Sequence, residues 1–159
     1  MELAFSYNKK KVIQALRYHF ISRKEIRIML ILVNVFAVIS AVLLYFKKIR
    51  PEPFLLGSVT WLLLMTGVWY ILPYSIYKRA PTFKDKFRIA FNEAEVHLEN
   101  SKGYVNWEWN RFSKFFETPH FFHLYFDAKT FFLVPKDEMG EDFRHSLWEL
   151  LNRKIGGKA

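Results

Sequence analysis

Residues 28–46 read IMLILVNVFAVISAVLLYF, a run of 19 residues without a charged side chain. A helix over this run is about 28 Å long, which matches a hydrocarbon core of about 30 Å. A second run, 54–77, reads FLLGSVTWLLLMTGVWYILPYSIY and holds 24 uncharged residues, of which the first 19 suffice to span. The first run is too long, and starts too far into the chain, to be the core of a signal peptide. The sequence therefore predicts two membrane-spanning helices.

The two runs are joined by only seven residues, 47–53, which include Pro51 and Pro53. Because so short a connection joins antiparallel neighbours, we expect a transmembrane hairpin over residues 28–77, with spans 28–46 and 54–77. Twelve basic residues lie near its outer ends, against three in the loop. The positive-inside rule then predicts a multi-pass protein of the cell membrane with both termini in the cytoplasm.

Side chains near the cytoplasmic ends of the hairpin are candidate contacts with the bilayer, because aromatic rings with a polar edge settle at headgroup level and basic groups attract anionic lipid. The candidate interfacial aromatics are Trp69, Tyr70, Tyr74 and Tyr77, and Pro73 is interpreted as the start of the exit from the membrane. The candidate membrane-surface contacts are Lys9, Lys10, Lys11, Arg17, Arg23, Lys24, Arg27, Lys78 and Arg79. For the basic helix of the N-terminal segment, the favoured interpretation is that its charges only set the topology while its apolar stripe packs on the β-domain.

Polar side chains within the two runs are few, and none is charged at neutral pH. Since an intramembrane charge would point to a pump or transporter, we expect an anchor instead. Asn34 is expected to form an interhelical hydrogen bond. The small residues Ala37, Ala41, Gly57 and Gly67 are expected to let the two helices approach closely.

The formal net charge of +9 lies entirely in residues 1–79, which hold 12 Lys/Arg and 3 Asp/Glu, whereas residues 80–159 hold 12 of each. A nucleic-acid-binding protein would carry the excess on its folded module, so we expect no nucleic-acid partner. The chain has no cysteine, which excludes disulfides and thiol catalysis.

Downstream of Pro81 apolar residues alternate with polar ones, as in half-buried strands. Six short strands are expected, within residues 87–91, 95–99, 104–109, 112–117, 121–126 and 130–134. The segment Leu3–Tyr7 alternates in the same way and precedes a basic amphipathic helix that Asn8 can cap. We expect this cytoplasmic segment, 1–27, to join the domain formed by residues 80–159.

The chain is expected to end in one helix, because Pro135 stops the last strand and acidic residues follow it. The apolar stripe of this helix contains Phe143, Leu147, Leu150 and Leu151. The helix is expected to end at Gly156-Gly157. An antiparallel meander closed by a terminal helix is the pleckstrin-homology (PH) arrangement. The expected fold class is thus membrane α+β: a two-helix transmembrane hairpin plus a small antiparallel meander, a PH-like barrel closed by the C-terminal helix.

The order of these elements resembles the YcxB-like membrane proteins of bacteria. The resemblance is carried by a strand, a basic helix with Leu16-Arg17-Tyr18-His19, a two-span hairpin, a meander, and Phe132-Leu133-Val134-Pro135-Lys136 before an acidic-capped helix. It covers essentially the whole chain. It implies a bacterial multi-pass protein with a PH-like cytoplasmic domain, and it carries over no functional residues.

No catalytic, cofactor-binding or metal site is expected. His120 and His123 stand three apart, and residues three apart in a strand point to opposite faces. For Glu141 and His145 capping and an i,i+4 contact are favoured over a shared metal. The phenylalanine pairs 115–116, 121–122 and 131–132 place one ring on each face of a sheet, so some rings are expected to meet a helix, the membrane or a partner.

The expected function is a membrane-anchored binding or scaffolding module that recognises a protein, a peptide or lipid headgroups. Its expected partners are the lipid bilayer and a protein or peptide, or a second copy of the chain. The alternative is a membrane self-protection (immunity) protein against a toxin or bacteriocin. No enzymatic activity is expected.

Overall fold

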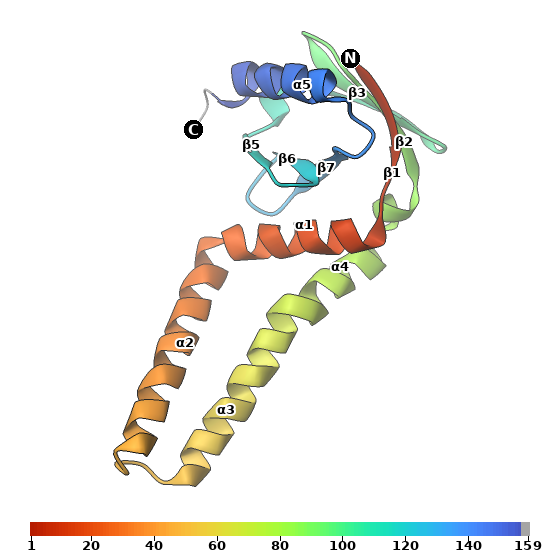
Figure 1. Ribbon diagram of the computed structural model, residues 1–159. Coiled ribbons are helices and arrows are strands. Elements are labelled where there is room, and N and C mark those ends of the chain that lie inside the picture. Colours follow the sequence, from red (N-terminus) through yellow and green to blue (C-terminus); the bar gives the residue numbers. More distant parts are fainter. Residues whose placement is uncertain (157–159) are drawn as a thin grey trace. The chain divides into compact units, whose positions relative to one another are not determined.

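The computed structural model describes residues 1–156, and these form two compact units. The first unit contains Met1–Ala15 and the chain from Ala80 onward, and the second contains Leu16–Arg79. Helix α1 (Lys9–Ser22) begins in the first unit and ends in the second (Figure 1). The predicted domain 80–159 and the predicted helix end at Gly157 extend beyond the described residues.

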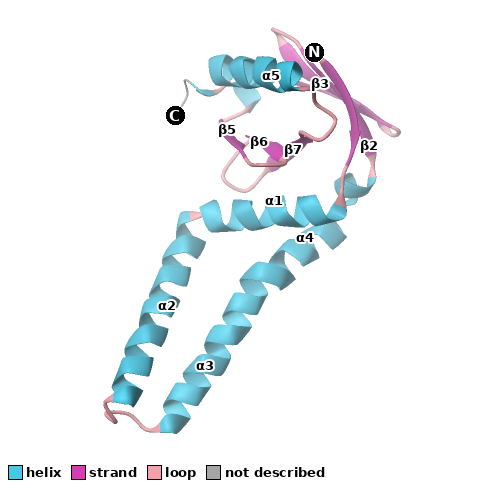
Figure 2. Cartoon of the chain, in the orientation of Figure 1, coloured by secondary structure: helices cyan, strands magenta, loops and turns pink. Residues whose placement is uncertain are grey.

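Seven strands of the first unit form two antiparallel sheets (Figure 2). The first sheet has the order β1 (Glu2–Ser6), β2 (Lys86–Phe91), β3 (Glu95–Asn100), β4 (Gly103–Glu108). The second has the order β5 (Lys114–Glu117), β6 (Phe121–Tyr125), β7 (Phe131–Pro135). Leu3 of β1 lies opposite Ile89 of β2, so the N-terminal strand joins the sheet although the whole second unit separates the two in sequence. The expected antiparallel strands are confirmed.

The two sheets are not closed into the expected barrel, since over residues 1–156 no pairing joins β4 to β5. Trp109–Arg111 form a 3-10 turn between them, so β4 ends one residue earlier than the periodicity predicts and β5 begins two residues later. Trp109 is buried in this turn, and its indole Nε1 donates to the carbonyl of Asn92 at 3.0 Å. The turn carries the chain from one sheet to the other and leaves β4 as an edge strand.

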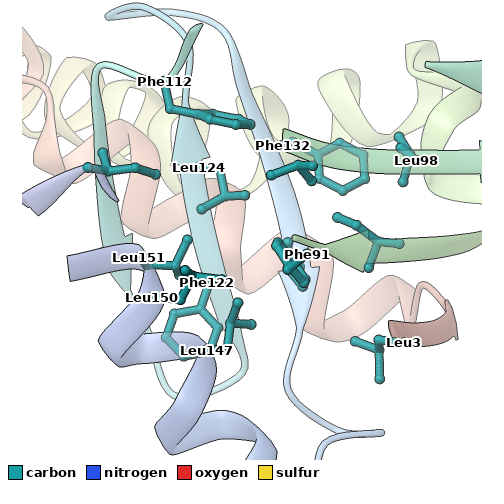
Figure 3. Close-up of a cluster of buried hydrophobic side chains, with 14 of the residues drawn as sticks. Leu3, Phe91, Leu98, Phe112, Phe122, Leu124, Phe132, Leu147, Leu150 and Leu151 are labelled. Atoms are coloured by element: carbon teal, nitrogen blue, oxygen red, sulfur yellow. The ribbon is translucent and has the colours of Figure 1, made fainter. Parts of the chain in front are cut away.

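The core of the first unit is formed by the inner faces of both sheets and by helix α5 (Glu141–Lys154) (Figure 3). Leu147, Leu150 and Leu151 are buried on α5 and belong to the same cluster as Phe91 and Phe122 of the two sheets. The predicted stripe of α5 is confirmed. Each such side chain contributes about 1.5–3 kcal/mol relative to remaining exposed.

Strand β6 is buried along its whole length, so both members of the pair Phe121-Phe122 are buried. Phe122 belongs to the core cluster, whereas Phe121 points to the other face, where its ring centroid lies 6.5 Å from that of Tyr7. In the pair 115–116 the outward ring is exposed, at 45% for Phe116. The structure therefore shows which outward-facing phenylalanine is covered and which is exposed. The sequence alone does not distinguish the two cases.

The second unit contains α2 (Lys24–Tyr45) and a continuous helical stretch, Pro51–Arg79. That stretch consists of α3 (Pro51–Thr66), a π-helical turn (Gly67–Ile71) and α4 (Leu72–Arg79). Both helices are long and apolar enough to cross a membrane, and Figure 1 shows α2 and α3 as antiparallel neighbours. The short segment Pro81–Lys84, in the first unit, forms a 3-10 turn before β2.

The predicted interhelical hydrogen bond of Asn34 is confirmed, because the indole Nε1 of Trp61 donates to its Oδ1 at 3.3 Å. The expected close approach at the glycines is wrong. A Cβ built at Gly57 or Gly67 would meet no atom within 4 Å. Instead, an apolar groove of about 1020 Å³, lined by both α2 and α3, separates the helices around Ala37 and Gly57.

Candidate membrane-interface site

The three lysines predicted to contact the membrane from the start of α1 lie in the first unit. The side-chain Oδ1 of Asn8 accepts hydrogen bonds from the amides of Lys10 and Lys11, at 3.0 and 3.4 Å, and so caps the helix as predicted. Lys9 and Lys10 are exposed, whereas Lys11 Nζ binds Asp137 Oδ1 at 2.7 Å. Lys11 is therefore engaged in an ion pair within the protein.

The other predicted basic contacts lie in the second unit. Arg23 precedes α2 and its Nε lies 3.9 Å from Glu25 Oε2, while Lys24 and Arg27 are exposed in the first turn of that helix. Lys78 and Arg79 are exposed in the last turn of α4, where a positive charge complements the helix dipole.

Pro73 lies inside a helix, and its interpretation as the start of the exit from the membrane stays a prediction. The helical stretch continues through it to Arg79, and Pro73 itself is buried. Since proline has no amide hydrogen, it leaves the carbonyl four residues earlier, that of Trp69, without its α-helical donor. The preceding turn relaxes to a π-helix, in which the amide of Leu72 donates to the carbonyl of Gly67.

The open carbonyl of Trp69 is taken by a side chain of α1. Arg17 Nε donates to Trp69 O at 2.8 Å, and the guanidinium carbon lies 5.2 Å from the centroid of the Tyr70 ring. A cation at this distance from an aromatic face is attracted to it. Three of the residues predicted separately, Arg17, Trp69 and Tyr70, are thus brought together within the second unit.

The remaining predicted aromatics, Tyr74 and Tyr77, follow on α4. Trp69, Tyr70 and Tyr74 are exposed and Tyr77 is half-buried. We call the group formed by Arg17, Trp69, Tyr70 and Pro73 the proline-turn site. The Arg17–Trp69 bond was missed from the sequence, although the proline four residues after Trp69 is a signal that this carbonyl needs another donor.

The histidines and acidic residues considered as metal ligands belong to the first unit. His120 precedes β6, and His123 is buried in β6 with its Nε2 3.3 Å from Thr118 Oγ1. The expected Glu141–His145 contact is wrong: His145 Nε2 lies 3.2 Å from Glu149, and Glu141 lies 3.6 Å from Arg144. Over residues 1–156 no three His, Asp or Glu side chains are grouped so as to hold a metal ion.

A similarity to known proteins is found over residues 91–145. This segment runs from the end of β2 through β3 to β7 and into α5. It matches the YcxB-like protein family. The resemblance predicted from the order of elements is thus confirmed over the part of the chain that contains Val134-Pro135-Lys136. The YcxB-like match does not include the two apolar helices or the proline-turn site. No curated protein and no solved structure matches the chain.

Proposed function

We propose that this chain is a membrane-anchored binding module, held in the bilayer by α2 and the stretch Pro51–Arg79. The observation that carries the anchor is the exposure of apolar side chains on both helices, for example 66% for Phe36 and 72% for Leu56. Neither α2 nor α3 has a buried residue. Soluble proteins rarely expose continuous apolar surface on this scale, whereas a bilayer covers it.

The lengths of the apolar parts of the two helices support an anchor. Arg27 and Lys47 bracket the uncharged run of α2 over about 30 Å, and on the second helix Glu52 and Tyr70 lie about 27 Å apart, at 1.5 Å per residue. Both lengths fit a hydrocarbon core of about 30 Å. We therefore place the cytoplasmic boundary of the second span at Tyr70, beside Arg17, and α4 beyond it. The basic excess at these ends favours both termini in the cytoplasm.

We propose that the first unit is a PH-like domain on the cytoplasmic side. Sheets of four and three antiparallel strands and a C-terminal helix support this assignment. Its binding surface would be the free edge of β4, because the backbone groups along an edge strand can pair with another extended chain. The exposed Tyr104 (75%) and Val105 (40%) on β4 offer apolar contacts to such a segment.

A photo-crosslinking amino acid in place of Tyr104 in the full-length protein, expressed in bacterial membranes, tests this function. A discrete adduct with another polypeptide is expected at position 104 and not at the exposed Ser146 of α5, which serves as the control. Val105→Glu should remove that adduct by introducing a charge beside the edge. Adducts that form equally at both positions, or at neither, would contradict the proposal for β4.

A further inference from the structure

We propose that the proline-turn site binds the phosphate of an anionic phospholipid through the two terminal amino groups of Arg17. The inference rests on the proposed membrane position of the second unit, but not on the proposed role of β4. It assigns to one arginine a specific lipid contact, beyond the general attraction between basic residues and the bilayer.

The guanidinium group is held by two contacts that leave its phosphate-binding end open. Its Nε donates to Trp69 O at 2.8 Å, and the guanidinium carbon lies over the Tyr70 ring, 5.2 Å from the ring centroid. Across the described residues, no carboxylate lies within ion-pair distance of Arg17. The two terminal amino groups form the planar fork that matches two oxygens of a phosphate.

The position of the site selects the ligand. Tyr70 lies about 27 Å along the helix from Glu52, so the guanidinium stands at the boundary of the hydrocarbon core, where phosphodiester groups of lipids lie. Tyr70 and Tyr74 are exposed beside it, and aromatic rings of this kind lie at headgroup level. A lipid phosphate therefore fits better than a soluble anion, which would have to leave bulk water to reach this depth.

Proline 73 gives the site its fixed geometry. With an ordinary residue at 73 the Trp69 carbonyl would also accept an amide hydrogen from the helix itself, and Arg17 would have to share this acceptor. Because the anchor uses Nε, a lysine at 17 retains the charge but has neither the anchor nor the fork. The substitution Arg17→Lys therefore separates the effect of the positive charge on lipid binding from the effect of the guanidinium geometry.

The test uses the full-length protein in nanodiscs that contain equal amounts of phosphatidylcholine and phosphatidylglycerol. Lipids that stay bound after detergent stripping are counted by native mass spectrometry. The wild type should retain phosphatidylglycerol in preference to phosphatidylcholine. Arg17→Gln should weaken that retention about tenfold or more, as expected for loss of charge-assisted hydrogen bonds. Arg17→Lys should fall between the two, and Arg50→Gln, which removes an arginine at the other end of the hairpin, should behave as the wild type.

The proposal would be overturned by the absence of any preference in the wild type or by full retention in Arg17→Gln. Full retention in Arg17→Lys would also overturn it, because charge alone would then suffice. Displacement of the lipid by excess inorganic phosphate would identify a soluble ligand instead. If Arg17→Gln is not recovered in membranes, Tyr70→Leu replaces it, with reduced retention expected and wild-type retention overturning the site. Carbonate-resistant membrane insertion, measured on the same samples, separates failure of the site from failure of the anchor.

Discussion

The phenolic oxygen of Tyr7 donates a hydrogen bond of 2.6 Å to the carbonyl of Leu133, which lies 126 residues later in the chain. The bond joins the segment after β1 to β7, and so links the chain before the apolar helices to the sheet after them. The rings of Phe5, Phe83 and Phe87 surround Tyr7 at centroid distances of 5.4, 5.3 and 6.0 Å.

Removing this hydroxyl should destabilise the first unit without changing its fold. For Tyr7→Phe in the detergent-solubilised full chain, we expect the free energy of unfolding to fall by about 1 kcal/mol, the usual net value of one hydrogen bond. Denaturant unfolding followed by tryptophan fluorescence measures it. Tyr104→Phe is the matched control, because Tyr104 is 75% exposed, and it should unfold as the wild type does. Equal losses in both variants would contradict a specific role for the Tyr7 bond.

The same residue should make stability fall at alkaline pH. Burial among aromatic rings raises the pKa of Tyr7 well above its ordinary value of about 10. The folded state therefore holds the proton more tightly than the unfolded state. The resulting stabilisation is complete below pH 10, and it is lost as the pH rises from there through the folded-state pKa. Unfolding midpoints across this range should fall more steeply for the wild type than for Tyr7→Phe, and parallel curves would contradict the prediction.

At acidic pH the link between the β2–β3 turn and the end of α5 should weaken. A hydrogen bond from Lys154, at 2.9 Å, and the positive charges of Arg153 and Lys154 lower the pKa of Glu93. The stabilisation it provides is present above the unfolded-state pKa of about 4.3, and it is lost as the pH falls through the folded-state value. Glu93→Gln should reduce the acid sensitivity of the unfolding midpoint. Glu99→Gln, at an exposed carboxylate on β3, is the control that should leave it unchanged.

The packing of α5 on the sheets should contribute several kcal/mol. Leu147 is fully buried at the centre of the helix, and truncation of such a leucine to alanine typically costs about 2–5 kcal/mol. We expect Leu147→Ala to lower the denaturation midpoint strongly and Ser146→Ala, on the exposed face, to leave it within about 0.5 kcal/mol of the wild type. A small effect of Leu147→Ala on the unfolding free energy would mean that α5 is not part of the cooperative core.

Elements with a strong local pattern were predictable from the sequence. The two uncharged runs, the alternating strands and the stripe of α5 each follow from a periodicity that burial imposes. The end of β4 did not follow, because Trp109 continues the alternation while its ring and indole hydrogen bond favour a 3-10 turn. The alternation of apolar and polar residues predicts which residues are buried, but it does not predict where a strand leaves its sheet.

The sequence predicted the individual residues of the candidate site, but it did not predict that they contact one another. Arg17, Trp69 and Tyr70 stood out by charge and by position near the end of an apolar run. Their contact depends on a carbonyl that Pro73 opens, and a tertiary hydrogen bond of this kind leaves no periodic signal. The partners of His145 and Glu141 were mispredicted for a related reason, because each residue on a helix has two or more neighbours at i±3 and i±4.

The central claim is that α2 and the stretch Pro51–Arg79 cross a bilayer, with the first unit on the cytoplasmic side. The chain has no cysteine, so single substitutions such as Lys48→Cys in the loop and Ser146→Cys on α5 give an unambiguous labelling signal. Treatment of intact bacterial spheroplasts with a membrane-impermeant maleimide should label Lys48→Cys at once and Ser146→Cys only after lysis. Labelling of both positions before lysis, or recovery of the protein in the soluble fraction, would contradict the account.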